Sequence, residues 1–423
     1  MLEKLANVFR IPDLRKRILF TLAMLAVYRL GGHIYTPGIN TDKLQQFFEQ
    51  SRGSLLGFVD LFSGGNLRRL TVFALGIMPY ITASIILQLL TVVYEPLAKL
   101  QKEGELGRKK ITQWTRYLTV ILSAIQSFGI AVSLQKAGDF VIEPGAKFIL
   151  MTMLTLTTGS AFIMWLGEQI TERGIGNGMS LLIFAGIVVG LPRAVVDLYD
   201  KVRTDAWGAF TAPAMILLMG VMILVVAFIV YVERSERRIP VQYAKRVVGR
   251  KVMGGQSTHL PLRVNAGGVM PVIFASSILT LPQTIGYGLR NNRYFGDLIR
   301  WLGWGEPLYT FLYAVGIIFF AYFYISIVFN PNEVADNMRK YGGFITGIHL
   351  NHLYGPIGAF FERLPTWMTN GLGVNFYFGG TSLLIVVGVA MDTVTQIEAQ
   401  LIMRHYDGFS PRSGRIRGRR TWS

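Results

Sequence analysis

Residues Ala74–Leu87, with the sequence ALGIMPYITASIIL, match residues Ala266–Leu279, AGGVMPVIFASSIL, without a gap. The two segments share an alanine, a glycine, the dipeptide Met-Pro, an isoleucine, Ala-Ser and Ile-Leu at equivalent positions. Small residues such as glycine and alanine are common in membrane helices, so a chance match is the alternative to an internal repeat. The aligned Met-Pro dipeptides favour the repeat.

The composition around these segments is that of a membrane protein. The 423 residues are 51% hydrophobic and 16% charged, whereas a soluble domain carries about 25% charged residues. Apolar runs of about 18 to 25 residues, enough to cross a bilayer core of about 30 Å, recur along the chain. We therefore predict an all-α polytopic membrane protein with ten transmembrane helices. The predicted spans cover residues 18–35, 71–94, 115–134, 148–166, 179–196, 213–231, 265–289, 308–329, 353–368 and 376–403.

The two matching segments lie five predicted spans apart, and an odd offset places them in opposite orientations in the membrane. Such an inverted repeat predicts two halves, residues 1–200 with helices 1–5 and residues 201–423 with helices 6–10, around a central path. Pro79 and Pro271 each lack a backbone donor, so we expect both helices to bend there. This architecture indicates a transporter or a channel.

Basic residues predict the orientation. The net charge is +17, and basic clusters precede span one, follow spans two and six, and end the chain. With ten spans all four clusters fall on one side, which the positive-inside rule assigns to the cytoplasm together with both termini. A nucleic-acid surface is the alternative explanation of the charge. Residues 1–17 and the long first apolar run predict an anchor and no cleavable signal peptide.

The loop between spans one and two contains an apolar segment that is too short to cross. Residues 55–65, LLGFVDLFSGG, end in a glycine pair. Irregular backbone at membrane depth survives only inside protein or a cavity, so we predict a re-entrant helix tucked into the bundle from outside. An amphipathic helix on the outer surface is the alternative.

The centres of spans two, five, seven and ten are nearly free of charge and rich in isoleucine. A hydrophobic constriction cannot coordinate an ion, but it can gate by dewetting or seal around a large, variable substrate. Ordinary bundle packing is the alternative. An ion-coupled solute carrier is the second functional hypothesis, but such carriers usually have ionisable residues mid-span. Here Asp392 and Glu398 lie toward the end of span ten, without an accompanying acid–base relay.

The residue types needed for catalysis or cofactor binding do not form recognisable patterns. Cysteine is absent, which excludes disulfides and thiolate metal sites. The glycine-rich segment Gly174–Gly178 lacks the Lys-Ser/Thr of a phosphate-binding loop. We therefore predict that the chain is not an enzyme, carries no cofactor or metal, and draws its energy from a partner.

Five motifs together resemble bacterial members of the SecY family, the channel subunit of the Sec protein translocon. They are Phe73–Ser84, Gly174–Gly178, Gln242–Arg246, Gln256–Leu262 and Phe378–Val386. They occur in the family's order over nearly the whole chain. The resemblance implies a channel in the bacterial cytoplasmic (inner) membrane that threads unfolded preproteins across it and releases hydrophobic segments sideways into lipid.

The resemblance also implies roles for individual residues. The pore ring, a central hydrophobic gasket, would be Ile81, Ile85, Ile183, Ile273 and Ile385. The plug at about residues 55–66 would include Leu55, Phe58, Asp60, Phe62, Gly64, Gly65 and Asn66. A lateral gate between spans two and three and spans seven and eight would carry Ser84, Gln88 and Asn265, for which interhelical packing bonds are the alternative.

The basic cytoplasmic loop at about residues 232–264 is the predicted docking surface. Arg246, Arg250 and Lys251 match the loop tip that binds the ribosome or the SecA ATPase in this family. Basic side chains there suit rRNA phosphates, and a purely topological role is the alternative. The other implied partners are small SecE- and SecG-type membrane subunits, signal peptides, unfolded preproteins and membrane lipids. The chain departs from the family at Thr346–Asn351, where His349 replaces the expected docking arginine.

Overall fold

A computed structural model describes residues 11–50, 60, 63–137, 140–204, 211–243, 246–248, 251–253, 258–286, 306–329, 331–340, 343–344 and 380–407. Nine of the ten predicted spans coincide with helices in these residues, which confirms the all-α membrane fold. The ninth predicted span, residues 353–368, lies outside them.

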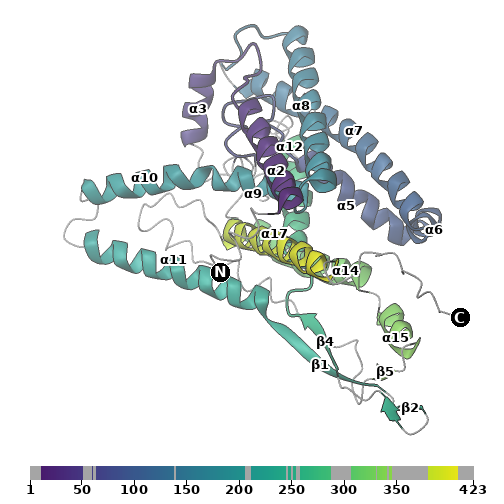
Figure 1. The fold of residues 1–423 in the computed structure, drawn as a ribbon. Coiled ribbons are helices and arrows are strands. Elements are labelled where there is room, and N and C mark those ends of the chain that lie inside the picture. Colours follow the sequence, from purple (N-terminus) through teal and green to yellow (C-terminus); the bar gives the residue numbers. More distant parts are fainter. Residues whose placement is uncertain are drawn as a thin grey trace, which may run out of the picture.

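The helices form one packed group with an extended strand hairpin projecting from it (Figure 1). The helices are α2 (Pro12–Gly31), α3 (Thr41–Gln50), α5 (Met78–Val93), α6 (Glu95–Lys102), α7 (Glu105–Ala137), α8 (Ala146–Arg173), α9 (Gly178–Val188), α10 (Gly190–Arg203), α11 (Thr211–Arg234), α12 (Met270–Gly286), α14 (Pro307–Val328), α15 (Pro331–Lys340) and α17 (Gly380–Asp407). The strands are β1 (Glu236–Tyr243), β2 (Arg246–Val248), β3 (Lys251–Met253), β4 (Thr258–Arg263) and β5 (Gly343–Phe344).

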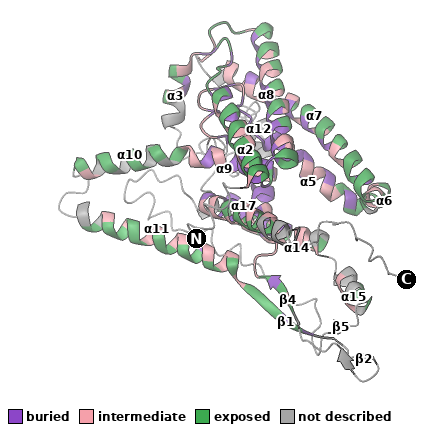
Figure 2. Ribbon diagram, viewed as in Figure 1, coloured by how far each residue is buried: buried purple, intermediate pink, exposed green. Residues whose placement is uncertain are grey.

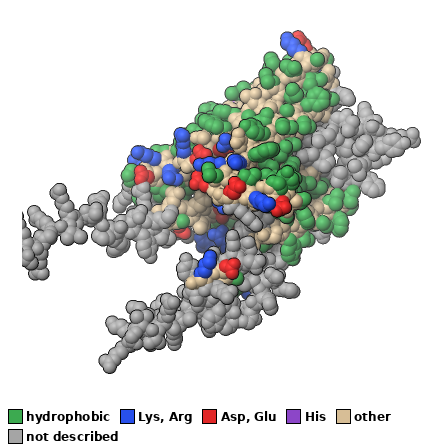
Figure 3. Space-filling model, turned by 90° about the vertical axis from the view of Figure 1, so that its right-hand side faces the viewer, with side chains coloured by type: hydrophobic (Ala, Val, Ile, Leu, Met, Phe, Trp, Pro, Cys, Tyr) green, Lys and Arg blue, Asp and Glu red, His purple; other side chains and the backbone are tan. Residues whose placement is uncertain are grey.

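Five helices in the described part of the chain are long and apolar enough to cross a membrane: α7, α8, α11, α14 and α17. The pair α5–α6, bent by 105°, makes a sixth if it counts as one span. The apolar helices expose much of their surface, and only 6% of the hydrophobic window of α11 is buried. Figure 3 shows this as a broad hydrophobic surface beside a region of charged side chains. Such surfaces suit contact with lipid.

The two prolines of the repeat lie at the start of helices and do not bend them. The prediction of a bend at Pro79 and Pro271 is therefore wrong. Helix α5 begins at Met78 and α12 at Met270, which places Pro79 and Pro271 at the second helical position. A proline in the first turn removes an N–H that has no helical partner in any case. Residues 71–77, predicted as the start of span two, form turns.

The repeat is also present in the backbone. Gly76 precedes α5 with φ of 56°, and the equivalent Gly268 precedes α12 with φ of 57°. This left-handed conformation is readily adopted by glycine. Two segments with the same turn and the same helix start are therefore an internal structural repeat, as the sequence predicted.

The fifth predicted span divides into two helices. The apolar α9 ends at Val188, and the amphipathic α10 starts at Gly190 with Pro192 in its first turn. Asn177 caps α9, because its side-chain oxygen accepts hydrogen bonds from the backbone N–H groups of Met179 and Ser180. Figure 2 shows α10 and α11 as mostly exposed, whereas buried residues concentrate around α9, α12 and α17.

The large basic loop folds as a β-hairpin, which the sequence did not predict. Strands β1 and β4 pair antiparallel from Glu236 opposite Arg263 to Val241 opposite Thr258. Strands β2 and β3 pair at the far tip, and β5 adds to the end of β1. Ile239 and Val241 of β1 are buried, while Arg237 and Arg238 are exposed. The basic side chains therefore stand on an ordered support.

Candidate functional site

Five isoleucines from four helices meet in one buried apolar cluster. Ile81 and Ile85 come from α5, Ile183 from α9, Ile273 from α12 and Ile385 from α17. Their exposed fractions range from 7% for Ile81 to 0% for Ile385. The structure therefore brings together all five residues predicted for the ring. Chemically, such a cluster excludes ions and water, because apolar side chains cannot replace an ion's hydration shell.

The cluster lies where α5 faces α12, the two helices of the repeat. Across this contact the Ser277 hydroxyl donates to the Met78 sulfur at 4.0 Å. The contact between Met78 and Ser277 was not predicted from the sequence. One signal was present, because Ser277 stands where the first copy of the repeat has the buried Ile85.

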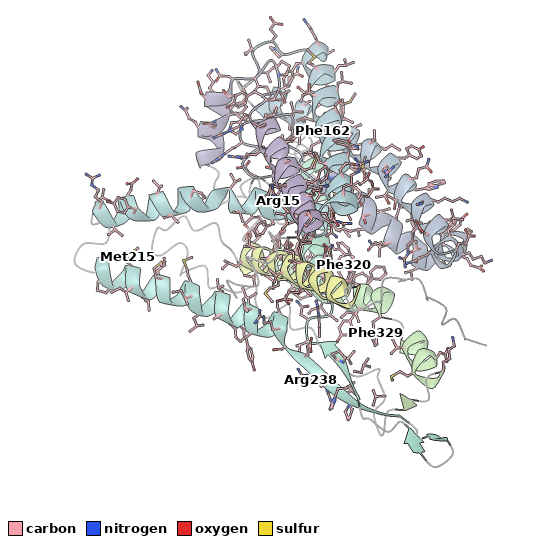
Figure 4. All side chains as sticks on the ribbon, in the orientation of Figure 1. Arg15, Phe162, Met215, Arg238, Phe320 and Phe329 are labelled. Carbon is pink, nitrogen blue, oxygen red and sulfur yellow. The ribbon has the colours of Figure 1, made fainter. Side chains whose placement is uncertain are left out.

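On the other side, α12 is joined to α14 by aromatic rings. The ring of Phe274 lies 5.9 Å from that of Phe320 and 6.0 Å from that of Tyr324, both in edge-on contacts. Phe320, labelled in Figure 4, is 6% exposed. Edge-to-face pairs are worth about 0.5–1.5 kcal/mol beyond their buried area. The aromatic contacts therefore hold α12 to α14 more strongly than the single Ser277–Met78 interaction holds α12 to α5.

The predicted gate residues do not form one group, because Ser84 and Gln88 are in contact with each other whereas Asn265 pairs elsewhere. The Gln88 amide donates to the Ser84 hydroxyl at 3.2 Å, within α5. The Asn265 amide donates to a carboxylate oxygen of Glu233, at the end of α11, at 2.8 Å. Ser84 and Gln88 are thus placed on a helix that faces α12, whereas Asn265 is held at the base of the hairpin.

Four of the predicted plug residues lie in the described part of the chain: Asp60, Gly64, Gly65 and Asn66. Leu55, Phe58 and Phe62 lie outside it. The Asp60 carboxylate accepts the Arg68 backbone N–H at 2.9 Å and lies 3.7 Å from the Arg68 Nε. Burial raises the pKa of the Asp60 carboxyl, and the Arg68 N–H and guanidinium oppose that shift.

The base of this segment is inserted between α2 and α9. The Tyr28 hydroxyl of α2 donates to the Ser63 carbonyl at 3.3 Å. Gly64, with φ of 72°, lies against the backbone of Gly186 in α9, so that a Cβ on Gly64 would stand 3.0 Å from the Gly186 Cα. Asn66 is 3% exposed. These contacts favour the first of the two predictions for this segment, that it is tucked into the bundle. They disfavour the alternative, an amphipathic helix lying on the outer surface.

Replacing Gly64 with alanine is expected to destabilise the protein by about 2–5 kcal/mol. The left-handed conformation costs about 1–2 kcal/mol for a residue with a Cβ, and overpacking against Gly186 adds about 1–3 kcal/mol. Thermal unfolding of the purified protein measures the effect. Gly104→Ala is the matched control, because Gly104 has φ of 78° and open space around its Cβ position. Equal losses in both variants would rule out the close contact.

Two of the three predicted docking residues lie at the hairpin tip. Arg246 is in β2 and Lys251 is in β3, and these strands pair at the far end of the hairpin from β1 and β4 (Figure 1). Arg250 lies outside the described residues. In the described residues no group of three or more histidine, aspartate or glutamate side chains is placed to hold a metal ion.

Comparisons with known proteins identify relatives of this chain. The family model of SecY matches residues 71–394. The protein translocase subunit SecY of Escherichia coli K12 is 46% identical, over 93% of each chain.

Two solved structures share the fold. One is a study of the SecY plug domain, described as stabilising the closed state of the translocation channel and maintaining a membrane seal. It has a TM-score of 0.63 at 17% identity, over 94% of this chain and 95% of the other. The other is Sec61 in the canine ribosome–channel complex, with a TM-score of 0.56 at 18% identity, over 94% and 95%.

Proposed function

Because this chain belongs to the SecY family, we propose that its five buried isoleucines form the constriction through which an unfolded polypeptide passes. The chain is a protein translocase channel in a membrane, and it is not an enzyme. The observation that carries the proposal is the meeting of isoleucines from α5, α9, α12 and α17 in one buried cluster. Residues 1–200 and 201–423 then act as two halves around the path.

The isoleucines of the ring act as a gasket. With no substrate present they pack against one another and exclude water and ions. Branched apolar side chains can separate around a passing chain without making residue-specific hydrogen bonds, so the seal tolerates variable sequences. Asp60, Gly64, Gly65 and Asn66 then belong to the base of a plug that closes the outer side of the resting channel.

Lateral release into lipid requires that two helix groups separate. The contact between α5 and α12 is the proposed gate, with α14 following α12 because of the Phe274 contacts. The Ser277–Met78 interaction is a weak hydrogen bond, so it resists opening less than a pair of charged groups would. Ser84, Gln88 and Asn265 are the further gate residues that the family resemblance suggests.

We infer the partners from the basic hairpin and from the similarity to Sec61 in its complex with the ribosome. The proposed docking residues for a translating ribosome or the SecA ATPase are Arg246, Arg250 and Lys251. Small SecE- and SecG-type subunits and lipid cover the exposed apolar helices, and signal peptides and preproteins occupy the path. The chain is a multi-pass membrane protein with bacterial relatives. The proposed location is the cytoplasmic membrane, with both termini on the cytoplasmic side.

A stalled preprotein tests the path directly. A photoreactive amino acid at Ile183 is expected to crosslink to the stalled chain, because Ile183 is 3% exposed within the cluster. The same probe at Leu217, 64% exposed on α11, is the control and should crosslink to lipid. Crosslinking to the preprotein from Leu217 but not from Ile183 would place the path elsewhere.

Reversing the charge at the hairpin tip is expected to weaken ribosome binding. The double variant Arg246→Glu, Lys251→Glu should lose at least about tenfold in affinity at low salt, because like charges repel across an interface. Co-sedimentation with purified 70S ribosomes over a salt series measures this, and the salt dependence should become shallower. Lys147→Glu, an exposed lysine at the start of α8, is the control for net charge. Unchanged binding by the double variant would remove the tip from the docking surface.

A further inference from the structure

Polar side chains from two helices, a strand and the segment that follows the strand meet at the base of the β1–β4 hairpin. The Asn265 amide donates to Glu233 Oε1 at 2.8 Å and lies 3.4 Å from the Gly268 carbonyl oxygen. Arg263 Nη1, at the end of β4, is 3.6 Å from Asp392 Oδ1 of α17. The Arg263 guanidinium attracts the Glu233 carboxylate, whereas the Asp392 carboxylate repels it. We call these four residues, Glu233, Arg263, Asn265 and Asp392, the hairpin-base network.

The network lies on the covalent connection between the hairpin and α12. Asn265 follows the last residue of β4 by two positions and precedes Met270, the first residue of α12, by five. The Val264 N–H donates to the Ser235 carbonyl at 3.0 Å, which joins this connection to the start of β1. Helix α12 carries Ile273 of the ring and Ser277 of the gate contact. A movement of the hairpin base therefore also moves the short segment that leads into α12.

The internal repeat shows that Asn265 is not needed to form this turn. Asn265 is equivalent to Phe73 in the first copy, a buried aromatic residue. Gly76 and Gly268 nevertheless have nearly the same φ, and both helices begin at the equivalent methionine. The polar contact therefore occurs in the half that carries the hairpin, at a position where the turn itself tolerates an apolar residue.

The two links of the network differ in strength. Glu233 and Asn265 are both partly buried, and a partly buried carboxylate depends on its hydrogen-bond donor. The Arg263–Asp392 pair is 53% and 69% exposed, and exposed ion pairs are worth about 0–1 kcal/mol. The Glu233–Asn265 hydrogen bond is therefore the main side-chain link between the end of α11 and the segment that leads from the hairpin to α12.

We propose that Glu233 and Asn265 are positioning residues that couple docking at the hairpin tip to movement of α12 away from α5. The paired strands act as a stiff lever, and the Glu233–Asn265 bond keeps the start of α12 aligned with its base. Without this bond the connection at residues 264–269 can absorb the displacement. This inference rests on the proposed docking of a ribosome at Arg246 and Lys251.

The experiment uses a disulfide across the gate contact. Because the chain has no cysteine, the variant Met78→Cys, Ser277→Cys carries the only thiols, at positions whose native side chains are 4.0 Å apart. Its rate of disulfide formation is measured with and without purified 70S ribosomes carrying a nascent chain with a signal sequence. Ribosome binding is measured separately by co-sedimentation. In this background docking should slow disulfide formation.

Removing the bond should separate docking from opening. Asn265→Ala and Glu233→Ala, each in the two-cysteine background, should bind ribosomes with unchanged affinity while the effect of docking on disulfide formation falls about fivefold. Glu233→Gln retains an oxygen acceptor for Asn265 and should restore the response. Glu398→Gln, which removes an exposed carboxylate elsewhere on α17, is the control. An unchanged rate without ribosomes shows that α5 and α12 still pack together in each variant.

A full ribosome response in both alanine variants would overturn the proposal. A response lost equally in Glu233→Gln and in Glu398→Gln would also contradict it, because general loss of negative charge would then explain the effect. Failure of the two-cysteine protein to bind ribosomes at all would instead refute the proposed docking, and this inference would fall with it.

Discussion

Replacing Ile273 with asparagine is expected to raise the ion conductance of reconstituted vesicles by at least about tenfold, since a barrier change of ~1.4 kcal/mol is a tenfold change in rate. Ile273 is 3% exposed and lies in the cluster with the other four isoleucines of the ring. An amide there supplies donors and acceptors to water, which stabilises the wetted state of a hydrophobic constriction. Ile273→Val, which keeps the side chain apolar, should conduct far less.

The control for this variant must be a buried isoleucine elsewhere. Ile229 of α11 is 2% exposed and lies outside the isoleucine cluster. Ile229→Asn should cost stability by burying an amide, about 1–3 kcal/mol, without raising conductance. Comparable leaks from both variants would mean that general loosening, and not the ring, causes the conductance. No leak from Ile273→Asn or from Ile385→Asn would exclude the gasket.

Replacing Gly178 with alanine is expected to destabilise the bundle by about 3 kcal/mol, the upper end of overpacking effects. A Cβ on Gly178 would overlap the backbone carbonyl of Gly167 in α8. A backbone atom cannot move aside as the end of a flexible side chain can, so α8 and α9 would have to separate. Thermal unfolding of the purified protein, followed by loss of the monodisperse species, measures the effect.

Gly220→Ala is the matched control for Gly178. Gly220 lies within α11 with nothing near its Cβ position. Alanine is favoured over glycine inside a helix by about 0.5–1 kcal/mol, so this variant should be neutral or slightly more stable. A stable Gly178→Ala protein would show that α8 and α9 do not approach as closely as the structure indicates.

The family resemblance predicted the five ring residues, and three of them also lie in a local sequence signal. A long apolar run identifies each helix, and the matched segments identify α5 and α12 as equivalent partners at the centre. Ile81, Ile85 and Ile273 lie within those segments, but the family resemblance was needed to group them with Ile183 and Ile385 as a ring. The lack of charge near the centres of the same helices favoured a hydrophobic path over an ion-coordinating one.

Pro79 and Pro271 show where such reasoning fails. A proline inside an apolar run is compatible with a bent helix or with the first turn of a helix. Which of these forms depends on the preceding residues, and here Gly76 and Gly268 adopt a left-handed conformation that ends the turn before the helix begins. The division of the fifth span at Val189 was not predicted for a similar reason. Hydropathy identifies an apolar run, but it does not distinguish one continuous helix from two helices joined end to end.

The sequence by itself determined the membrane class and the inverted repeat, because apolar length and spacing are properties of single segments. The five isoleucines of the proposed ring were selected by the family resemblance. Only the tertiary structure decided which polar side chains meet. The partner of Asn265 proved to be Glu233, thirty-two residues away, and Ser277 lies against Met78 across 199 residues. A polar side chain has many possible partners along a chain, and the packing of helices determines which one lies within hydrogen-bonding distance.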